Sequence, residues 1–182
     1  MESKELDVLQ LFFDNPTREL HFEEILREAR ITRSKAAAWL NNFVKEDLIT
    51  RVKERNKMPY YLSNYESSAY RNKKKLFAFT QLYESGLLNS LSSLEKAKAV
   101  ILFGSFARSD WYKNSDIDIF IYGNPEGLNI ANYELKLNRE IQLFICHNKE
   151  ELNKFSSGLI RNIIKGNLIK GDIDFIKVEA NA

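Results

Sequence analysis

Asp116 and Asp118, two aspartates separated by one residue, follow the turn Gly104-Ser105 within the segment AVILFGSFARSDWYKNSDIDIFIYG at residues 99–123. Side chains alternate along a strand, so both carboxylates would lie side by side on one face. Such a pair is costly unless a cation neutralises it, and magnesium held by carboxylates and substrate phosphates is the usual solution. The glycine lets a phosphate approach the backbone, and exposed amides at a helix start favour an anion. These residues predict a magnesium and phosphate site.

The elements that would hold this site can be predicted from the apolar pattern around it. Ser105 is placed to cap a short helix that contains Arg108. The isoleucines between and after the aspartates would face the core, on the side of their strand opposite the carboxylates. The predicted elements are strands over 99–103, 115–122 and 141–146, and a helix over 128–138.

The sequence GSFAR followed by SDIDIFI resembles the DNA polymerase beta superfamily of nucleotidyltransferases, and in particular prokaryotic proteins that fuse a winged helix to a minimal nucleotidyltransferase. The resemblance implies transfer of a nucleoside monophosphate from a triphosphate, with ATP as the expected nucleotide and Mg²⁺ as cofactor, to a hydroxyl acceptor. It assigns Asp116 and Asp118 to metal binding and catalysis. It assigns to the nucleotide Gly104, Ser105, Arg108 and Ser115.

The same superfamily has a third carboxylate, on the strand after the following helix, which helps to bind metal and can accept the proton of the attacking hydroxyl. Gln142 occupies the aligned position, and an amide cannot act as a base. Glu140 lies two residues earlier on the same strand face and is the expected catalytic replacement. Two functions stay open: a working transferase, or a DNA-binding regulator whose transferase-like domain senses nucleotide without turning it over.

The first third of the chain has a different pattern. Helical spacing predicts helices over 3–14, from Phe22 to about residue 30, and from a cap at Thr32, and two short strands follow over 48–52 and 60–62. The residues expected on the buried side of the third helix are Ala36, Ala37, Leu40, Phe43 and Val44. This order, with the segment LNNFVKEDLITRVKERNKMPYYLS, resembles a winged helix over roughly residues 3–63.

A winged helix implies DNA binding, with the third helix in the major groove and the hairpin on the backbone. The resemblance places near bases Arg33, Ser34, Lys35, Trp39 and Asn42, and near phosphates Arg51, Lys53, Arg55 and Lys57. Two alternatives remain: the module mediates protein contacts or dimerisation, and Trp39 belongs to the core. A second basic run, RNKKK at residues 71–75, is predicted to lie on a solvated surface.

These patterns together predict an α+β protein in three parts. They are a winged helix-turn-helix domain at 1–63, a helical connector at 64–98, and a nucleotidyltransferase-type α/β domain with a small mixed sheet at 99–182. The apolar face of the connector is expected to comprise Leu76, Phe77, Phe79, Leu82 and Tyr83.

Composition narrows the class of protein and its partners. Of the 182 residues Cys146 is the only cysteine, which excludes an internal disulfide and a zinc site of several thiolates. A net charge of +2 does not by itself indicate nucleic acid. Neither a membrane-length apolar run nor a secretory signal is evident, so a cytoplasmic protein without a membrane partner is expected. The expected partners are a nucleoside triphosphate, duplex DNA, an acceptor protein of the toxin type, and a second copy in a homodimer.

Overall fold

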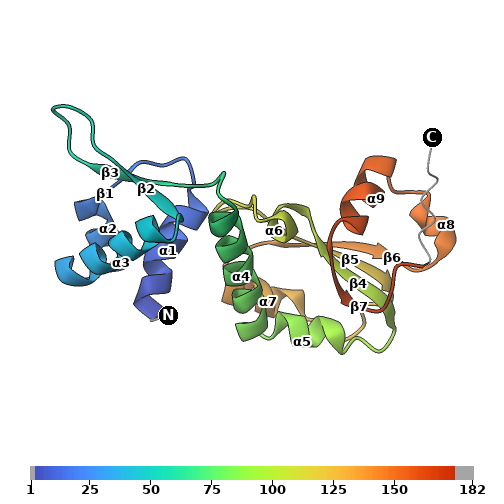
Figure 1. The fold of residues 1–182 in the computed structure, drawn as a ribbon. Helices are drawn as coiled ribbons and strands as arrows, with labels where there is room; N and C mark the ends of the chain where they lie inside the picture. Colours follow the sequence, from blue (N-terminus) through green and yellow to red (C-terminus); the bar gives the residue numbers. More distant parts are fainter. Residues whose placement is uncertain (1–2, 175–182) are drawn as a thin grey trace. The chain divides into compact units, whose positions relative to one another are not determined.

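The structure, a computed structural model, describes residues 3–174 and divides the chain into two compact units (Figure 1). The first unit comprises Met1–Leu76 together with Asp110–Asn114, and the second comprises Phe77–Ser109 and Ser115–Ala182. A five-residue segment from the loop between the Gly-Ser turn and the aspartates therefore belongs to the first unit.

The first unit contains helices packed with a three-stranded antiparallel sheet of order β1-β3-β2. The helices predicted over 3–14, from Phe22 and after Thr32 are present, as are the two strands predicted after them. Strand β1 pairs with β3 but spans only two residues, too few for an alternating pattern to be recognised. The elements are α1 (Ser3–Asp14), β1 (Leu20–His21), α2 (Phe22–Ala29), α3 (Arg33–Lys45), β2 (Ile49–Val52), β3 (Tyr60–Ser63) and the start of α4 (Ser68–Glu84).

Helix α3 buries a narrower stripe than predicted. Ala36, Leu40 and Phe43 are buried, but Ala37 and Val44 are exposed, so their predicted burial is wrong. Trp39 completes the stripe instead at 9% exposure, which contradicts its assignment to DNA bases. The buried positions follow the i, i+3, i+4, i+7 spacing of one helix face, and positions 37 and 44 lie beyond its edge.

Thr32 is the N-cap residue of α3, as predicted, but its side chain does not bond to the helix backbone. Its hydroxyl lies 3.2 Å from that of Ser34. The predicted capping hydrogen bond is therefore replaced by a contact between two hydroxyl groups.

Lys74, in the basic run predicted to be solvated, is only 1% exposed, and the prediction is wrong at this position. Its ammonium donates to the carbonyls of Phe13, at 2.8 Å, and Trp111, at 2.6 Å, and lies 4.3 Å from the centroid of the Trp111 ring. A buried ammonium is tolerated because these carbonyls and the ring replace water. Trp111, itself fully buried, brings the segment 110–114 into the core of the first unit.

Helix α4 and the following helix α5 (Leu87–Ser92) cover the part predicted as a helical connector. Phe77 and Leu82 are buried as expected, whereas Leu76 is 66% and Tyr83 63% exposed, so the predicted apolar face is wrong at these two positions. The small residue Ala78 is buried instead. The predicted apolar face, which contained only large apolar residues, was therefore broader than the face that is buried.

The second unit contains a four-stranded sheet of order β6-β5-β4-β7. Strands β5 and β6 run parallel and the other neighbours antiparallel, so the small mixed sheet predicted for this part is present. Helix α7 connects the parallel pair, as a parallel connection requires. The strands are β4 (Ala97–Phe103), β5 (Ile117–Gly123), β6 (Ile141–Cys146) and β7 (Asn167–Lys170); the helices are α6 (Gly104–Arg108), α7 (Ile130–Leu137), α8 (Lys149–Leu152) and α9 (Ser157–Ile164).

Both faces of β5 are anchored in apolar side chains. The predicted core face is confirmed, because Ile117, Ile119 and Ile121 are fully buried. On the opposite face Phe120 is also fully buried, two residues after Asp118. It packs in a cluster formed by Ile101, Phe103, Phe120, Cys146, Leu152 and Ile163. The strand that carries Asp118 is thus fixed from both sides. Within residues 3–174, helices long and apolar enough to span a bilayer are absent.

Candidate functional site

The glycine turn at the end of β4 is in direct contact with Asp118. Gly104 has φ +71°, a left-handed conformation that favours glycine. A Cβ at this position would lie 1.9 Å from Asp118 Oδ2. Gly104 is therefore required for two reasons, its backbone conformation and the space that it leaves for the carboxylate.

The aspartate pair lies where β5 begins. Asp118 is on the strand, half-buried, and pairs with Phe103 of β4 on one side and Gln142 of β6 on the other. Asp116 precedes the strand and is exposed, so the strand starts two residues later than predicted. One carboxylate is thus held by the sheet, and the other stands at its solvent edge.

The electrostatic environment of Asp118 disfavours its charged form. Burial raises the pKa of this carboxyl and the neighbouring charge of Asp116 raises it further, while the guanidinium of Arg108 lowers it. Arg108 is therefore close enough to act on the carboxylate, and its side chain is exposed. A divalent cation at the pair would relieve both unfavourable effects.

Replacing Asp118 with asparagine is expected to stabilise the protein at neutral pH, because it removes a charge that the fold disfavours. The raised folded-state pKa means that the folded protein holds this proton more tightly than the unfolded chain. The gain in stability should therefore be absent below the pKa of this carboxyl in the unfolded chain, about 4. It should grow as the pH rises through the pKa of the carboxyl in the folded protein. Thermal unfolding of both proteins between about pH 4 and pH 8 measures it. A loss of stability that is the same at every pH would contradict the account.

The serines assigned to the nucleotide lie on the two segments that flank the aspartates. Ser105 is half-buried in the first turn of α6, but the N-cap residue is Phe103, so the predicted capping role of Ser105 is wrong. The helix starts at the glycine, one residue before Ser105. Ser115 directly precedes Asp116, and its carbonyl accepts a hydrogen bond from Arg139.

Arg139 is a residue of this region that the sequence analysis missed. Its Nη1 donates to the Ser115 carbonyl at 3.1 Å, and its guanidinium lies 5.2 Å from the centroid of the Phe106 ring on α6. It therefore connects the segment before Asp116 with the helix that follows Gly104. The signal available in the sequence was a basic residue shortly before the strand that carries Gln142.

Gln142, the residue that the family resemblance aligns with the third carboxylate, lies on β6 (Ile141–Cys146), the strand predicted to carry it. Gln142 is the direct β-sheet neighbour of Asp118, and its side chain is exposed. Glu140 directly precedes β6, is exposed, and its carbonyl accepts a hydrogen bond from Ile117 N at 2.9 Å. Glu140 thus lies beside the start of β5, near Asp116 in register. Within residues 3–174 no group of three or more acidic, histidine or cysteine side chains is placed to hold a metal.

The residues present fit a magnesium ion whose coordination is completed by the phosphates of a substrate. Magnesium is commonly held by one or two carboxylates together with phosphates and water. Asp116 and Asp118 supply two carboxylates, and burial together with the charge of Asp116 raises the pKa of Asp118, an effect that a cation at the pair would counteract. The side chain of Gln142 adds an amide oxygen at the adjacent strand position.

The geometry agrees with a comparison to known families. Residues 86–175 match the family model described as Polymerase beta, Nucleotidyltransferase. The matched region contains the glycine turn, both aspartates and Gln142, and it supports the predicted place of this part in the DNA polymerase beta-like superfamily. Searches of curated proteins and of solved structures gave no match.

A second Asp-x-Asp, Asp172 and Asp174, lies after β7. Both residues are exposed, and Asp172 Oδ1 accepts a hydrogen bond from the Asp174 amide at 3.2 Å, which forms a local turn. The residues after Asp174 lie outside the described part of the chain.

The residues assigned to DNA lie on the exposed surface of the first unit, apart from Trp39. Arg33 forms an ion pair with Glu23 at 2.7 Å, and Lys35 lies 5.5 Å from the centroid of the Trp39 ring. Ser34 and Asn42 are exposed on the same helix. The start of α3 is therefore accessible, with one of its cations already paired.

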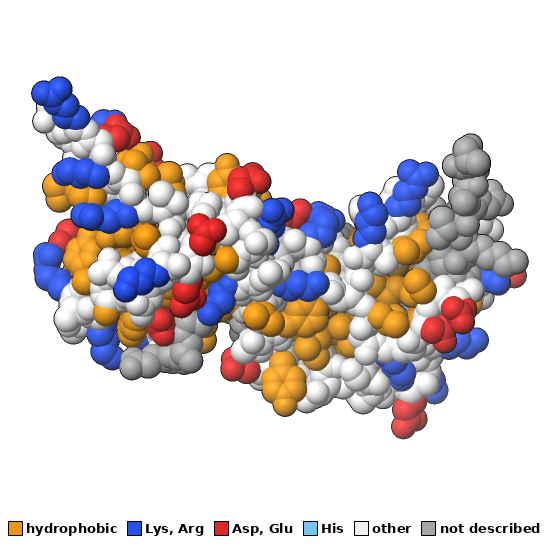
Figure 2. Space-filling model, in the orientation of Figure 1, with side chains coloured by type: hydrophobic (Ala, Val, Ile, Leu, Met, Phe, Trp, Pro, Cys, Tyr) orange, Lys and Arg blue, Asp and Glu red, His pale blue; other side chains and the backbone are white. Residues whose placement is uncertain are grey.

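The β2–β3 hairpin carries the other assigned cations. Figure 2 shows Lys and Arg side chains gathered toward the tip of the hairpin, with an acidic group nearby. Lys57 pairs with Glu54 at 2.6 Å, and this contact raises the pKa of the lysine. Lys53 donates to the Lys57 carbonyl at 3.2 Å. Arg51, Lys53 and Arg55 are exposed, and they carry the charge that the hairpin can offer to an anion.

Proposed function

We propose that this protein is a magnesium-dependent nucleotidyltransferase that transfers a nucleoside monophosphate from a triphosphate to a hydroxyl group. The observation that carries the proposal is the contact between Gly104 and Asp118, with Asp116 beside them, inside the region that matches the nucleotidyltransferase family. In the proposed complex Asp116 and Asp118 hold the cation, which would neutralise charge on the leaving pyrophosphate.

The remaining residues position the triphosphate and the proton. Gly104 leaves its backbone accessible, and Ser105 and Ser115 provide hydroxyl groups on either side of the aspartates. Arg108, whose charge already acts on Asp118, is assigned to the phosphates. Glu140 is the proposed base for the attacking hydroxyl, in place of the carboxylate that Gln142 lacks.

We propose ATP as the nucleotide and a cytoplasmic site of action. The acceptor class that we favour is a partner protein of the toxin type; a small molecule and an RNA end are the competing acceptors. The exposed positions of Asp116 and Glu140 are compatible with a large acceptor, because neither side chain lies in the core.

The proposal is tested by following label from each of the four α-labelled triphosphates into the protein itself and into candidate proteins, RNAs and small hydroxyl compounds. Magnesium-dependent incorporation that is lost in the Asp116→Asn/Asp118→Asn variant is expected. Label transfer that persists in that variant would contradict the proposed site.

A second function is favoured by one observation, the pairing of Asp118 with Gln142 at the position of the third carboxylate. In this alternative the domain binds magnesium nucleotide without transferring it, and the first unit is a winged-helix regulator of DNA. Nucleotide binding without label transfer to any acceptor class would favour this sensor over the enzyme.

Whether the second unit is an enzyme or a nucleotide sensor, we propose that the first unit binds duplex DNA or a partner protein. In the complex with DNA, the β2–β3 hairpin would lie on the phosphate backbone. Substituting Lys53 and Arg55 together with glutamine is expected to weaken DNA binding and to reduce the log-log salt slope by about 0.9 for each lost contact. Lys57→Gln is the matched control, since this lysine is already paired with Glu54 and should change the slope less. An unchanged slope in the double variant would favour a protein partner.

A further inference from the structure

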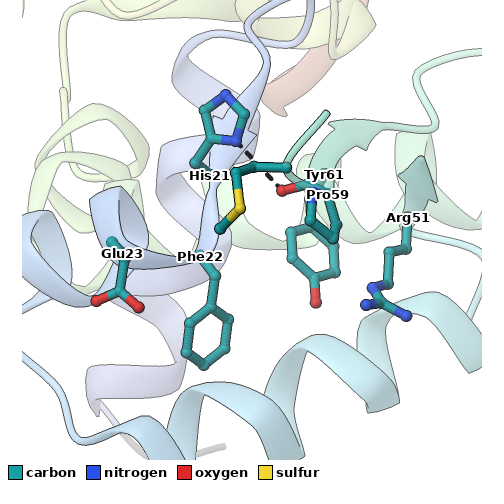
Figure 3. A pocket seen from close by; sticks show the side chains of 7 residues that line it. His21, Phe22, Glu23, Arg51, Pro59 and Tyr61 are labelled. Atoms are coloured by element: carbon teal, nitrogen blue, oxygen red, sulfur yellow. Dashed lines mark hydrogen bonds between the residues drawn. The ribbon is translucent and has the colours of Figure 1, made fainter. Parts of the chain in front are cut away.

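The first unit contains a pocket that none of the proposed roles uses. It lies between the start of α2 and the β2–β3 hairpin and has a volume of about 560 Å³, within the range of sites for small organic molecules. The residues that line this hairpin pocket are His21, Phe22, Glu23, Arg51, Met58, Pro59 and Tyr61. Figure 3 shows Glu23 and Arg51 toward opposite ends, with Phe22 and Tyr61 between them.

The walls of the hairpin pocket are mainly apolar and aromatic. Phe22 and Tyr61 contribute rings, and Pro59 and Met58 contribute apolar surface from the hairpin. Met58 is 72% exposed, although a large apolar side chain gains from being covered. A planar apolar group is the kind of ligand that such walls bind.

Tyr61 offers a polar group to the hairpin pocket. Its residue is 7% exposed, but its hydroxyl is not among the buried polar atoms that lack a partner, so this hydroxyl reaches solvent. The hydroxyls of the other buried tyrosines of this unit are used within the protein: Tyr60 donates to Glu54 at 3.0 Å and Tyr70 to the Phe12 carbonyl at 2.9 Å. The Tyr61 hydroxyl can therefore exchange water for a polar group of a ligand in the pocket.

The charge in the hairpin pocket that is not paired with an opposite charge is positive. Glu23 is paired with Arg33 at 2.7 Å, and His21 donates from Nδ1 to the Pro59 carbonyl at 3.2 Å. In the described part of the chain Arg51 has no carboxylate within ion-pair distance. It lies directly across the sheet from Tyr61, on the same face, because the two residues are register partners. Their polar groups can therefore act on one ligand.

We infer that the hairpin pocket binds a small aromatic carboxylate. Its ring lies against Phe22 and Met58, Arg51 pairs with its carboxylate through the guanidinium fork, and the Tyr61 hydroxyl donates to the same group. Because Arg51 is also one of the cations assigned to DNA, an occupied pocket removes that charge from the hairpin surface. The inference concerns the first unit alone and does not depend on the transferase chemistry.

The test uses the full chain and ligand-observed NMR with benzoate, 3-phenylpropionate, indole-3-acetate and 2-naphthoate, each compared with its primary amide. We expect at least one acid to bind below about 5 mM and its amide to bind about tenfold more weakly, because the amide loses the charged pair. Arg51→Gln should lose the preference for the acid, and Tyr61→Phe should weaken acid binding about threefold or more.

Lys53→Gln is the matched control, since it removes a hairpin cation that does not line the pocket. It should bind the acid as the native protein does. Equal binding of acid and amide, acid binding retained in Arg51→Gln, or no binding by any of the acids would each overturn the inference. The comparison of acid with amide on the native protein keeps the test valid even if a variant fails to fold.

Discussion

Gly104→Ala is expected to abolish magnesium-dependent nucleotide binding while most of the fold remains. The new Cβ would lie 1.9 Å from Asp118 Oδ2, so the carboxylate must move or the turn must open. The backbone at φ +71° adds a cost of about 1 kcal/mol or more for a residue with a side chain. Calorimetric titration with magnesium nucleotide, together with thermal unfolding, measures both effects.

Gly127→Ala is the matched control for this substitution. Gly127 also has a positive φ, +88°, but a Cβ there meets nothing within 4 Å. It should therefore show the backbone cost without loss of nucleotide binding. Equal losses of binding in both variants would mean that backbone strain, and not the contact with Asp118, explains the effect.

Gln142→Asp is expected to raise the rate of nucleotide transfer by on the order of a hundredfold or more, if the missing carboxylate limits the reaction. Gln142 is the direct neighbour of Asp118, so an aspartate there can both complete the metal ligands and accept a proton. Nucleotide affinity should stay the same or increase. Label transfer under single-turnover conditions measures the rate separately from binding.

Glu140→Gln distinguishes the two sources of the base. If Glu140 already accepts the proton, this variant should lose the native activity, and Gln142→Asp should gain little. Glu150→Gln is a suitable control, because Glu150 is an exposed glutamate on α8. Clear native activity that survives Glu140→Gln would refute both assignments and would mean that the base lies elsewhere or that the two aspartates suffice.

The part of the fold that forms the candidate site was largely predictable, because its elements have local signals. Alternation in β5 separated Asp118 from the buried isoleucines, and the spacing from the glycine turn brought the two segments together. The parallel register of β5 and β6 also makes Gln142 the neighbour of Asp118. The first two inferences needed only a strand period and a short connection, whereas the alignment of Gln142 with a third carboxylate came from the family resemblance.

The features that were missed depend on contacts between distant residues. The burial of Lys74 requires two carbonyls, from Phe13 and Trp111, that lie far from it in sequence, and its neighbours in the run RNKKK gave no sign of them. Arg139 reaches the Ser115 carbonyl through the pairing of β5 with β6. Composition and periodicity describe one element at a time, so they could not predict such contacts.

The central claim, that Asp116, Asp118 and the Gly104 turn form one magnesium nucleotide site, is tested most directly by calorimetric titration of ATP with and without magnesium. The native protein should bind the nucleotide only with magnesium. Asp116→Asn/Asp118→Asn should stay folded, with native far-UV circular dichroism, and should lose this binding. Unchanged magnesium-dependent affinity in the folded double variant would contradict the claim.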